Sequence, residues 1–207
     1  MLDDAVGFAR WQRDVLLPAI SQSLEQAGRA LSTMVQSPIR VAVPHVAMVG
    51  IDEITPSVGG AGVPVVAAYL GMTGDMAGHL MFMFPMPVGF GLVDRLLGQP
   101  PKTTITLGTL ETSALAELAN ITGSSILNGL ADAAGLRVLP SSPTVRTDMA
   151  GALLESVLVP VAQRSEQVVL IRTVFEGDGW GIVGDCFLLP TVEGLEALVQ
   201  GLVSRKS

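Results

Sequence analysis

The chain has 207 residues, a length that fits one domain or two small ones. Apolar residues make up 49% of it and charged residues only 15%, which excludes a disordered chain, a collagen and a coiled coil. The formal net charge of −7 argues against a general nucleic-acid-binding protein, because such a protein needs a basic surface to displace counterions.

The mean hydropathy of +0.52 raises the question of a membrane span. The longest uncharged apolar stretch, residues 80–93, is interrupted by Pro85 and Pro87 and falls short of the roughly 20 residues that a span needs. The single cysteine, Cys186, cannot form an internal disulfide, which suits a reducing compartment. It lies in an apolar, strand-like run, which favours a structural thiol over a nucleophile. We therefore expect a soluble, cytoplasmic protein without a membrane span.

The first half of the chain combines helical and strand-like patterns. Apolar residues from Leu16 to Leu31 recur at steps of three or four, the spacing of a helix that buries one face. Gly74-Asp75 indicates a turn between two strands. The predicted elements are a long helix (3–36), a strand (39–49), a loop (52–63), two strands (64–71 and 78–84) and a short helix (87–98).

After a linker at 99–102 a similar order of elements begins again. Gly135 is the expected stop of a long helix, and Gly177-Asp178-Gly179 is a strong hairpin signal. The predicted elements are a helix (109–134), an extended segment (136–147), a second helix (149–159), two strands (167–175 and 180–188) and a last helix (190–203). The second helix has no counterpart among the elements predicted for the first half.

The two halves can be aligned with a shift of 99 residues. This shift pairs Leu16 with Leu115, Leu31 with Leu130, Pro44 with Pro143 and Val46 with Val145. We therefore predict an α/β protein of the α+β type, a single domain over 1–207 with repeat halves at about 3–98 and 103–203. The two pseudo-symmetric halves would form a shared antiparallel sheet covered by the long helices. Two unrelated α/β halves are the alternative.

The helix predicted over 109–134 has two distinct faces. At 100° per residue the apolar side chains form one continuous stripe, made of Leu115, Leu118, Ala119, Ile126 and Leu130. Small and polar side chains occupy the opposite side, among them Glu117 and Asn120, which emerge together because they are three residues apart. The helical geometry alone fits either an ordinary solvated face or a docking surface.

The spacing Ser113-x3-Glu117-x2-Asn120-x22-Pro143 resembles the signature of the CheC/CheX/FliY family of chemotaxis phosphatases. The surrounding residues 113–145, the following 148–158 and the ending 174–203 are most similar to the CheC members of that family. The resemblance covers nearly the whole chain and implies a single CheC-like domain.

The resemblance implies an enzyme, a protein aspartyl-phosphate phosphatase that acts on a phosphorylated CheY-type response regulator. In this family the Asn orients the attacking water and the Glu pairs with a Lys of the regulator, roles that would fall to Asn120 and Glu117. An aspartyl phosphate is an activated acyl phosphate that needs a positioned water rather than a new nucleophile. Mg²⁺ is expected to be bound by the regulator, so no cofactor of this chain's own is expected.

The first half departs from the family's pattern at the equivalent positions. Pro18 stands in place of the Glu and Ser21 in place of the Asn, while Asp14 and Pro44 keep the frame. A Ser is too short to reach into a partner's site as an Asn would, and a proline inside a helix kinks or restarts it. The first site is therefore predicted to be degenerate.

A non-catalytic binding or adaptor protein is the alternative function. Such a protein would sequester the regulator, take part in the flagellar switch, or bind the receptor-modifying deamidase CheD, a partner that the resemblance suggests. The intact Glu117/Asn120 pair favours catalysis. The lack of a FliN-like segment after Val203 argues against a switch component.

Other candidate sites are weaker. The glycine cluster at 59–62 lacks the Gly-Lys-Ser/Thr ending of a phosphate-binding loop, which favours an ordinary loop. His45 and His79 have no metal-ligand spacing, so we expect structural or incidental roles and no metal site. Met81 and Met83 alternate with apolar residues in one strand, which favours a strand buried on both faces; an edge position would instead make it a surface for a partner.

Overall fold

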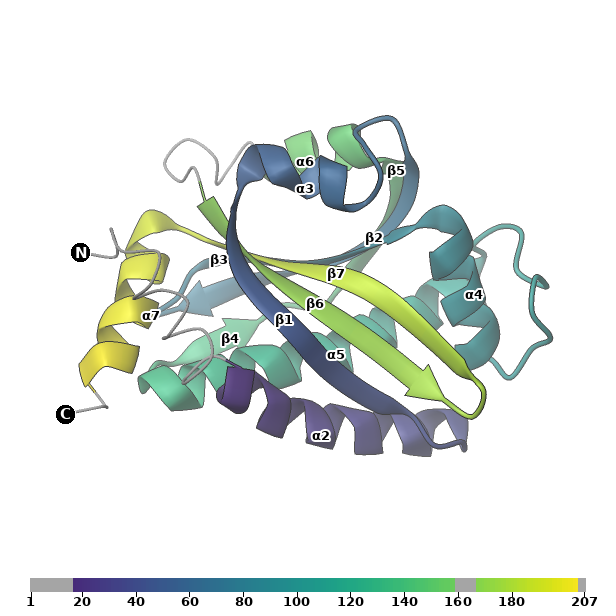
Figure 1. Ribbon diagram of the computed structural model, residues 1–207, viewed down its shortest axis with the longest axis horizontal. Coiled ribbons are helices and arrows are strands. Elements are labelled where there is room, and N and C mark those ends of the chain that lie inside the picture. The colour runs from purple at the N-terminus through teal and green to yellow at the C-terminus, as the bar shows by residue number, and fades with distance from the viewer. Residues whose placement is uncertain (1–16, 159–166, 205–207) are drawn as a thin grey trace.

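The computed structural model describes residues 17–158 and 167–204, which form one twisted antiparallel sheet with helices on both faces (Figure 1). The fold class predicted from the sequence is confirmed. In chain order the elements are α2 (Leu17–Val35), β1 (Arg40–Gly50), η2 (Ile51–Glu53), α3 (Ile54–Ser57), β2 (Pro64–Gly74), β3 (Gly78–Pro85), α4 (Met86–Leu96), α5 (Thr109–Ala134), β4 (Val138–Pro140), β5 (Thr144–Met149), α6 (Ala150–Leu158), β6 (Gln167–Gly177), β7 (Trp180–Pro190) and α7 (Val192–Ser204).

The strand order of the sheet is β1-β6-β7-β3-β2-β4, with β5 also paired to β2. The two hairpins, β2–β3 and β6–β7, meet at the centre, where β3 pairs with β7. Each edge strand pairs with the hairpin of the other half: β1 with β6, and β4 and β5 with β2. The two parts of the chain therefore exchange their edge strands and complete one sheet together. The predicted bounds of the halves, 3–98 and 103–203, stay a prediction.

Two prolines 99 residues apart occupy matching places at the two sheet edges. The register between β1 and β6 shifts between Ala42 and His45, and Pro44 lies within that shift. On the other edge the ladder breaks between β4 and β5, and Pro143 lies in this break. Proline lacks the N–H that a ladder needs, so its place within a sheet is at an edge or a bulge.

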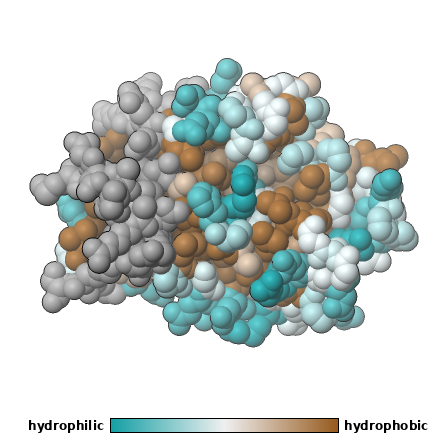
Figure 2. Space-filling model, viewed as in Figure 1, coloured by the Kyte–Doolittle hydropathy of each residue, from teal (hydrophilic) through white to brown (hydrophobic). Residues whose placement is uncertain are grey.

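The sheet is buried on both faces. The long helices α2 and α5 lie against one face, and the short helices α3 and α6 lie on the other (Figure 1). Leu80, Phe82 and Phe84 of β3 point to the long helices and Met81 and Met83 to the short ones, all at most 1% exposed. The prediction of a strand buried on both faces is confirmed. Figure 2 shows hydrophilic side chains along the lower edge, where Figure 1 places α2.

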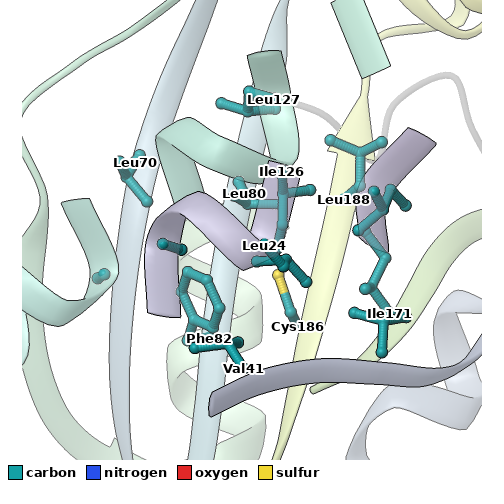
Figure 3. Close-up of a cluster of buried hydrophobic side chains, with 14 of the residues drawn as sticks. Leu24, Val41, Leu70, Leu80, Phe82, Ile126, Leu127, Ile171, Cys186 and Leu188 are labelled. Atoms are coloured by element: carbon teal, nitrogen blue, oxygen red, sulfur yellow. The ribbon is translucent and has the colours of Figure 1, made fainter. Parts of the chain in front are cut away.

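The larger core cluster includes the thiol of Cys186 (Figure 3). The side chain is fully buried beside Leu24 of α2 and Ile126 of α5. Burial raises the pKa of the Cys186 thiol well above its ordinary value, and the neighbouring Asp185 carboxylate adds to the effect. The thiol is therefore protonated and shielded from solvent, which agrees with a structural role.

Several predicted elements differ from those observed. The segment 52–63, predicted to be a loop, contains the end of the 3₁₀ helix η2 and the four-residue helix α3. The helix α6 of the second half thus has a counterpart, α3, in the first half. The prediction that α6 is an extra helix without a counterpart was wrong. Four residues are too few to show a helical pattern of apolar residues. Pro56 lies within α3, and a proline there favours the prediction of a loop. The extended segment predicted at 136–147 is two strands, β4 and β5. The part of helix 3–36 before Leu17 lies outside the described residues.

No helix within 17–158 and 167–204 has the length and apolar character needed to cross a membrane.

Gly129 lies where α2 and α5 cross closely, and we expect Gly129→Ala to lower the free energy of unfolding by about 1–3 kcal/mol. A Cβ at this position would lie 2.7 Å from the carbonyl oxygen of Ala19 and 3.0 Å from the Cβ of Ser23. Gly91→Ala in α4 is the matched control. No atom lies within 4 Å of the Cβ it would add, so its better helix propensity is expected to stabilise the protein by about 1 kcal/mol. Urea unfolding measures the free energy of unfolding of both variants. Equal changes for Gly129→Ala and Gly91→Ala would contradict the close crossing of α2 and α5 at Gly129.

Candidate functional site

The helix α5 has well-defined ends, at the residues predicted from the sequence. It begins at Thr109, and the N–H of the preceding Gly108 donates a hydrogen bond of 2.9 Å to the Glu111 carboxylate. It ends at Gly135, whose φ of 71° is the left-handed conformation that favours glycine. The side chains along this helix therefore keep a fixed register.

The inner face of α5 is anchored on the sheet. The predicted apolar stripe is at most 1% exposed, and its members are Leu115, Leu118, Ala119, Ile126 and Leu130. A Cβ at Gly123 would lie 3.0 Å from Leu70 and 3.1 Å from Leu80, so the helix backbone packs directly on β2 and β3. This packing sets which side of α5 faces solvent.

Ser113, Glu117 and Asn120 are all exposed on the outer side of α5, as predicted. The Ser113 hydroxyl donates a 2.8 Å hydrogen bond to the carbonyl of Thr109 within the helix. Across the part of the chain that the structure describes, neither the Glu117 carboxylate nor the Asn120 carboxamide has a side-chain hydrogen bond or an ion pair. Both groups are thus available to a partner.

The charges along α5 are all negative. The helix carries Glu111, Glu117 and Asp132, and its 26 residues include no Lys or Arg. Such a helix attracts a cationic group, and the attraction is strongest where a partner excludes water. The outer face of α5 therefore suits a partner with two neighbouring groups: a positive charge that pairs with a carboxylate, and a polar group that forms a hydrogen bond with the Asn120 carboxamide.

Pro143 lies at the sheet edge that α5 contacts, in the break between β4 and β5. The break is held by Ser141, whose N–H donates to the carbonyl of Gly71 at 2.8 Å and whose hydroxyl accepts from the N–H of Gly71 at 2.9 Å. The structure thus gives Pro143 a defined role at the sheet edge. It brings together Ser113, Glu117 and Asn120 on one helix face.

Pro18 and Ser21 lie apart from this face, on the exposed side of α2. The helices α2 and α5 run antiparallel (Figure 1), and Gly129 meets the stretch of α2 around Ser21. Asn120 precedes Gly129 by nine residues, which is about 14 Å along the helix axis. Pro18 occupies the first turn of the described part of α2. The predicted kink depends on residues before Leu17, which lie outside the described residues together with Asp14.

Asp94 is a structurally important residue that no motif in the sequence indicates. Its side chain is fully buried in α4 and accepts hydrogen bonds from the N–H groups of Thr103 (3.2 Å) and Thr104 (2.8 Å). Burial raises the pKa of Asp94, but hydrogen bonds from Thr104, Lys102 and Thr103 outweigh it and hold the pKa below its ordinary value. The ionised carboxylate thereby fastens the linker that leads into α5. The one available signal was a charged residue on the apolar side of a short helix.

The other candidate sites have no catalytic geometry. Within residues 17–158 and 167–204, no group of three or more His, Cys, Asp or Glu side chains could hold a metal ion. His45 is exposed on β1, and His79 is half-buried on β3, where burial lowers its pKa. The glycines at 59–62 lead into β2 rather than into a helix, so they do not form a phosphate-binding loop.

Comparison with known proteins identifies a family match and a curated relative. The CheC-like family matches residues 110–146, a stretch that contains Ser113, Glu117, Asn120 and Pro143. The "CheY-P phosphatase CheC" of Bacillus subtilis (strain 168) is 30% identical over 200 residues, which cover 95% of this chain and 96% of that protein.

Two solved structures share the fold of this chain. Thermotoga maritima FliY superimposes with a TM-score of 0.76 at 15% identity, covering 99% of this chain and all of that one. The middle domain of FliM from H. pylori superimposes with a TM-score of 0.64 at 11% identity, covering 92% and 98% of the two chains. At these identities the likeness extends to the fold alone.

Proposed function

The chain belongs to the CheC-like family, and from this membership we propose that it is a phosphatase that hydrolyses the aspartyl phosphate of a CheY-type response regulator. The observation that carries the proposal is the pair of exposed side chains on the outer face of α5, Glu117 and Asn120, which have no hydrogen bond or ion pair among the described residues. The pair lies within the stretch that matches the family.

In the proposed reaction Asn120 positions the attacking water. A carboxamide offers both an acceptor and two donors, and it holds a water by hydrogen bonds although it is not a base near pH 7. Glutamine orients water in the same way in GTPases. Anchoring of α5 on the sheet favours this role, because the carboxamide then enters the regulator's site from a fixed direction.

Glu117 contributes docking rather than chemistry in this proposal. It emerges on the same face as Asn120, three residues earlier, and its carboxylate would pair with a lysine of the regulator. The magnesium ion that neutralises the phosphoryl group would come with the regulator. The negative charge along α5 favours the approach of both cations.

We propose one working site for each chain. Ser21 is shorter than Asn120 and lies about 14 Å from it along the helix pair, so it would neither replace Asn120 nor assist it. Binding of CheD and a cytoplasmic location remain predictions from the sequence.

The test is the rate at which a phosphorylated CheY-type regulator loses phosphate with and without this protein. An accelerated loss that is catalytic, with many regulators turned over per chain, supports the proposal. Binding of the phosphorylated regulator without acceleration would contradict it and would favour the alternative, a sequestering or adaptor protein.

A further inference from the structure

Two large apolar side chains are exposed at the start of α5. Ile105, in the loop before the helix, is 83% exposed, and Leu110, the second residue of the helix, is 61% exposed. In Figure 2 hydrophobic surface is visible at the end of the molecule where Figure 1 places the loop between α4 and α5. Single exposed apolar residues are common, but these two are five residues apart and border the candidate site.

Leu110 shares a helix face with the candidate site. It precedes Ser113 by three residues and Glu117 by seven, which is the spacing of one continuous stripe along a helix. The distance from Leu110 to Glu117 along the axis is about 10 Å. The stripe therefore combines an apolar residue at one end with the polar pair at the other.

The loop that carries Ile105 is held in place by hydrogen bonds to α4. Asp94 is fully buried in α4, and its carboxylate accepts the N–H groups of Thr103 and Thr104, directly before Ile105. The N-terminal end of α5 follows within a few residues and is capped by the Glu111 carboxylate. Ile105 is thus exposed in an ordered loop, five residues before Leu110.

We propose that Ile105 and Leu110 form the apolar part of the docking surface for the response regulator, in contact with its receiver domain beside the phosphorylated aspartate. This inference rests on the proposed function. A regulator whose phosphoryl group reaches Asn120 must cover the outer face of α5. A stable interface buries about 800 Å² on each partner, a patch with a radius of about 16 Å, and Leu110 lies about 15 Å from Asn120 along the helix axis, so a patch centred on Asn120 extends to Leu110. The regulator would therefore bury Leu110 against an apolar surface of its own.

The test compares Leu110→Ser and Ile105→Ser with the wild type. A serine is well tolerated in the first turn of a helix, so the fold is expected to persist. We expect Leu110→Ser to raise the KM for the phosphorylated regulator, and the Kd measured by calorimetry, by about tenfold, because burial of a leucine is lost. The kcat should stay within twofold, since neither residue touches the reacting atoms.

Val203→Ser is the matched control. Val203 is 57% exposed near the end of α7, away from this stripe, and its replacement should leave both KM and Kd unchanged. A KM and Kd of Leu110→Ser within twofold of wild type would overturn the docking surface and leave the proposed function standing. A wild-type protein that does not accelerate phosphate loss would overturn the proposed function. In that case the calorimetric Kd of Leu110→Ser still decides the docking surface.

Discussion

Asn120→Ala is expected to lower the rate of phosphate loss from the phosphorylated regulator by about 100-fold, with the affinity for the regulator nearly unchanged. The size follows from other enzymes, in which removal of one positioned polar group costs 10²–10³ in kcat. Asn120 is exposed at the surface and supports no hydrogen bond among the described residues, so alanine at this helix position should leave the fold intact. Single-turnover decay of the phosphorylated regulator at saturating phosphatase measures the chemical step directly.

Ser21→Ala is the control for Asn120→Ala. Ser21 is the position that the shift of 99 residues pairs with Asn120, and it is exposed as Asn120 is, so the two substitutions disturb the surface to a similar degree. We expect Ser21→Ala to leave the rate unchanged. An Asn120→Ala protein that retains full acceleration would refute the proposed mechanism, and a loss caused by Ser21→Ala would show that the first half still takes part.

Phe82→Ala is expected to reduce the free energy of unfolding by about 3–5 kcal/mol, the cost typical of a phenylalanine removed from a close-packed core. Phe82 is 0% exposed on the central strand β3, where it pairs with Cys186 of β7 and lies in the cluster between the sheet and the long helices (Figure 3). Replacement leaves a cavity at the junction of the two hairpins, which the surrounding backbone can close only in part.

Ile105→Ala provides the comparison for Phe82→Ala. Ile105 is almost fully exposed, and its truncation should change the free energy of unfolding by no more than about 0.5 kcal/mol. Urea unfolding followed by circular dichroism, with equal m-values, measures both variants. A loss below 1 kcal/mol for Phe82→Ala would be inconsistent with a continuous core across the hairpin junction.

The parts of the fold with strong local signals could be predicted from the sequence. The helix Thr109–Ala134 was predicted with its observed ends, because Gly135 is a clear stop and the apolar stripe has helical spacing. The hairpin at Gly177-Asp178-Gly179 was predicted for the same reason: glycine tolerates the φ of 74° observed at Gly179. Local rules apply there because the decisive contacts are close in the sequence.

The pairing of distant strands could not be predicted in this way. Nothing in the residues of β1 indicates that its partner is β6, more than 115 positions later, since any apolar strand fits the pattern. The short helix α3 was missed because its four residues are stabilised by burial of Ile54 rather than by helix propensity. Asp94 was missed because its partners are main-chain N–H groups, which have no sequence signature.

The sequence predicts which helix face carries the candidate site, but not which apolar side chains are exposed beside it. The spacing of Ser113, Glu117 and Asn120 placed them on one helix face, and the structure agrees. Spacing also places Leu110 on this outer face, but only the structure shows that its side chain and that of Ile105 are left uncovered. The chemical roles of Glu117 and Asn120 remain proposals from family membership.

The exchange of edge strands has a consequence for how this protein can change over evolutionary time. Because β1 pairs with the hairpin of the second half and β5 with that of the first, deletion of either half would leave the remaining hairpin without its neighbours on both sides. Surface positions such as Pro18 and Ser21 are under no such constraint. If the halves arose by duplication, as the sequence predicts, and the second carries the proposed site, the first half can lose its own site through substitutions on one exposed helix and still be retained because the shared sheet needs it.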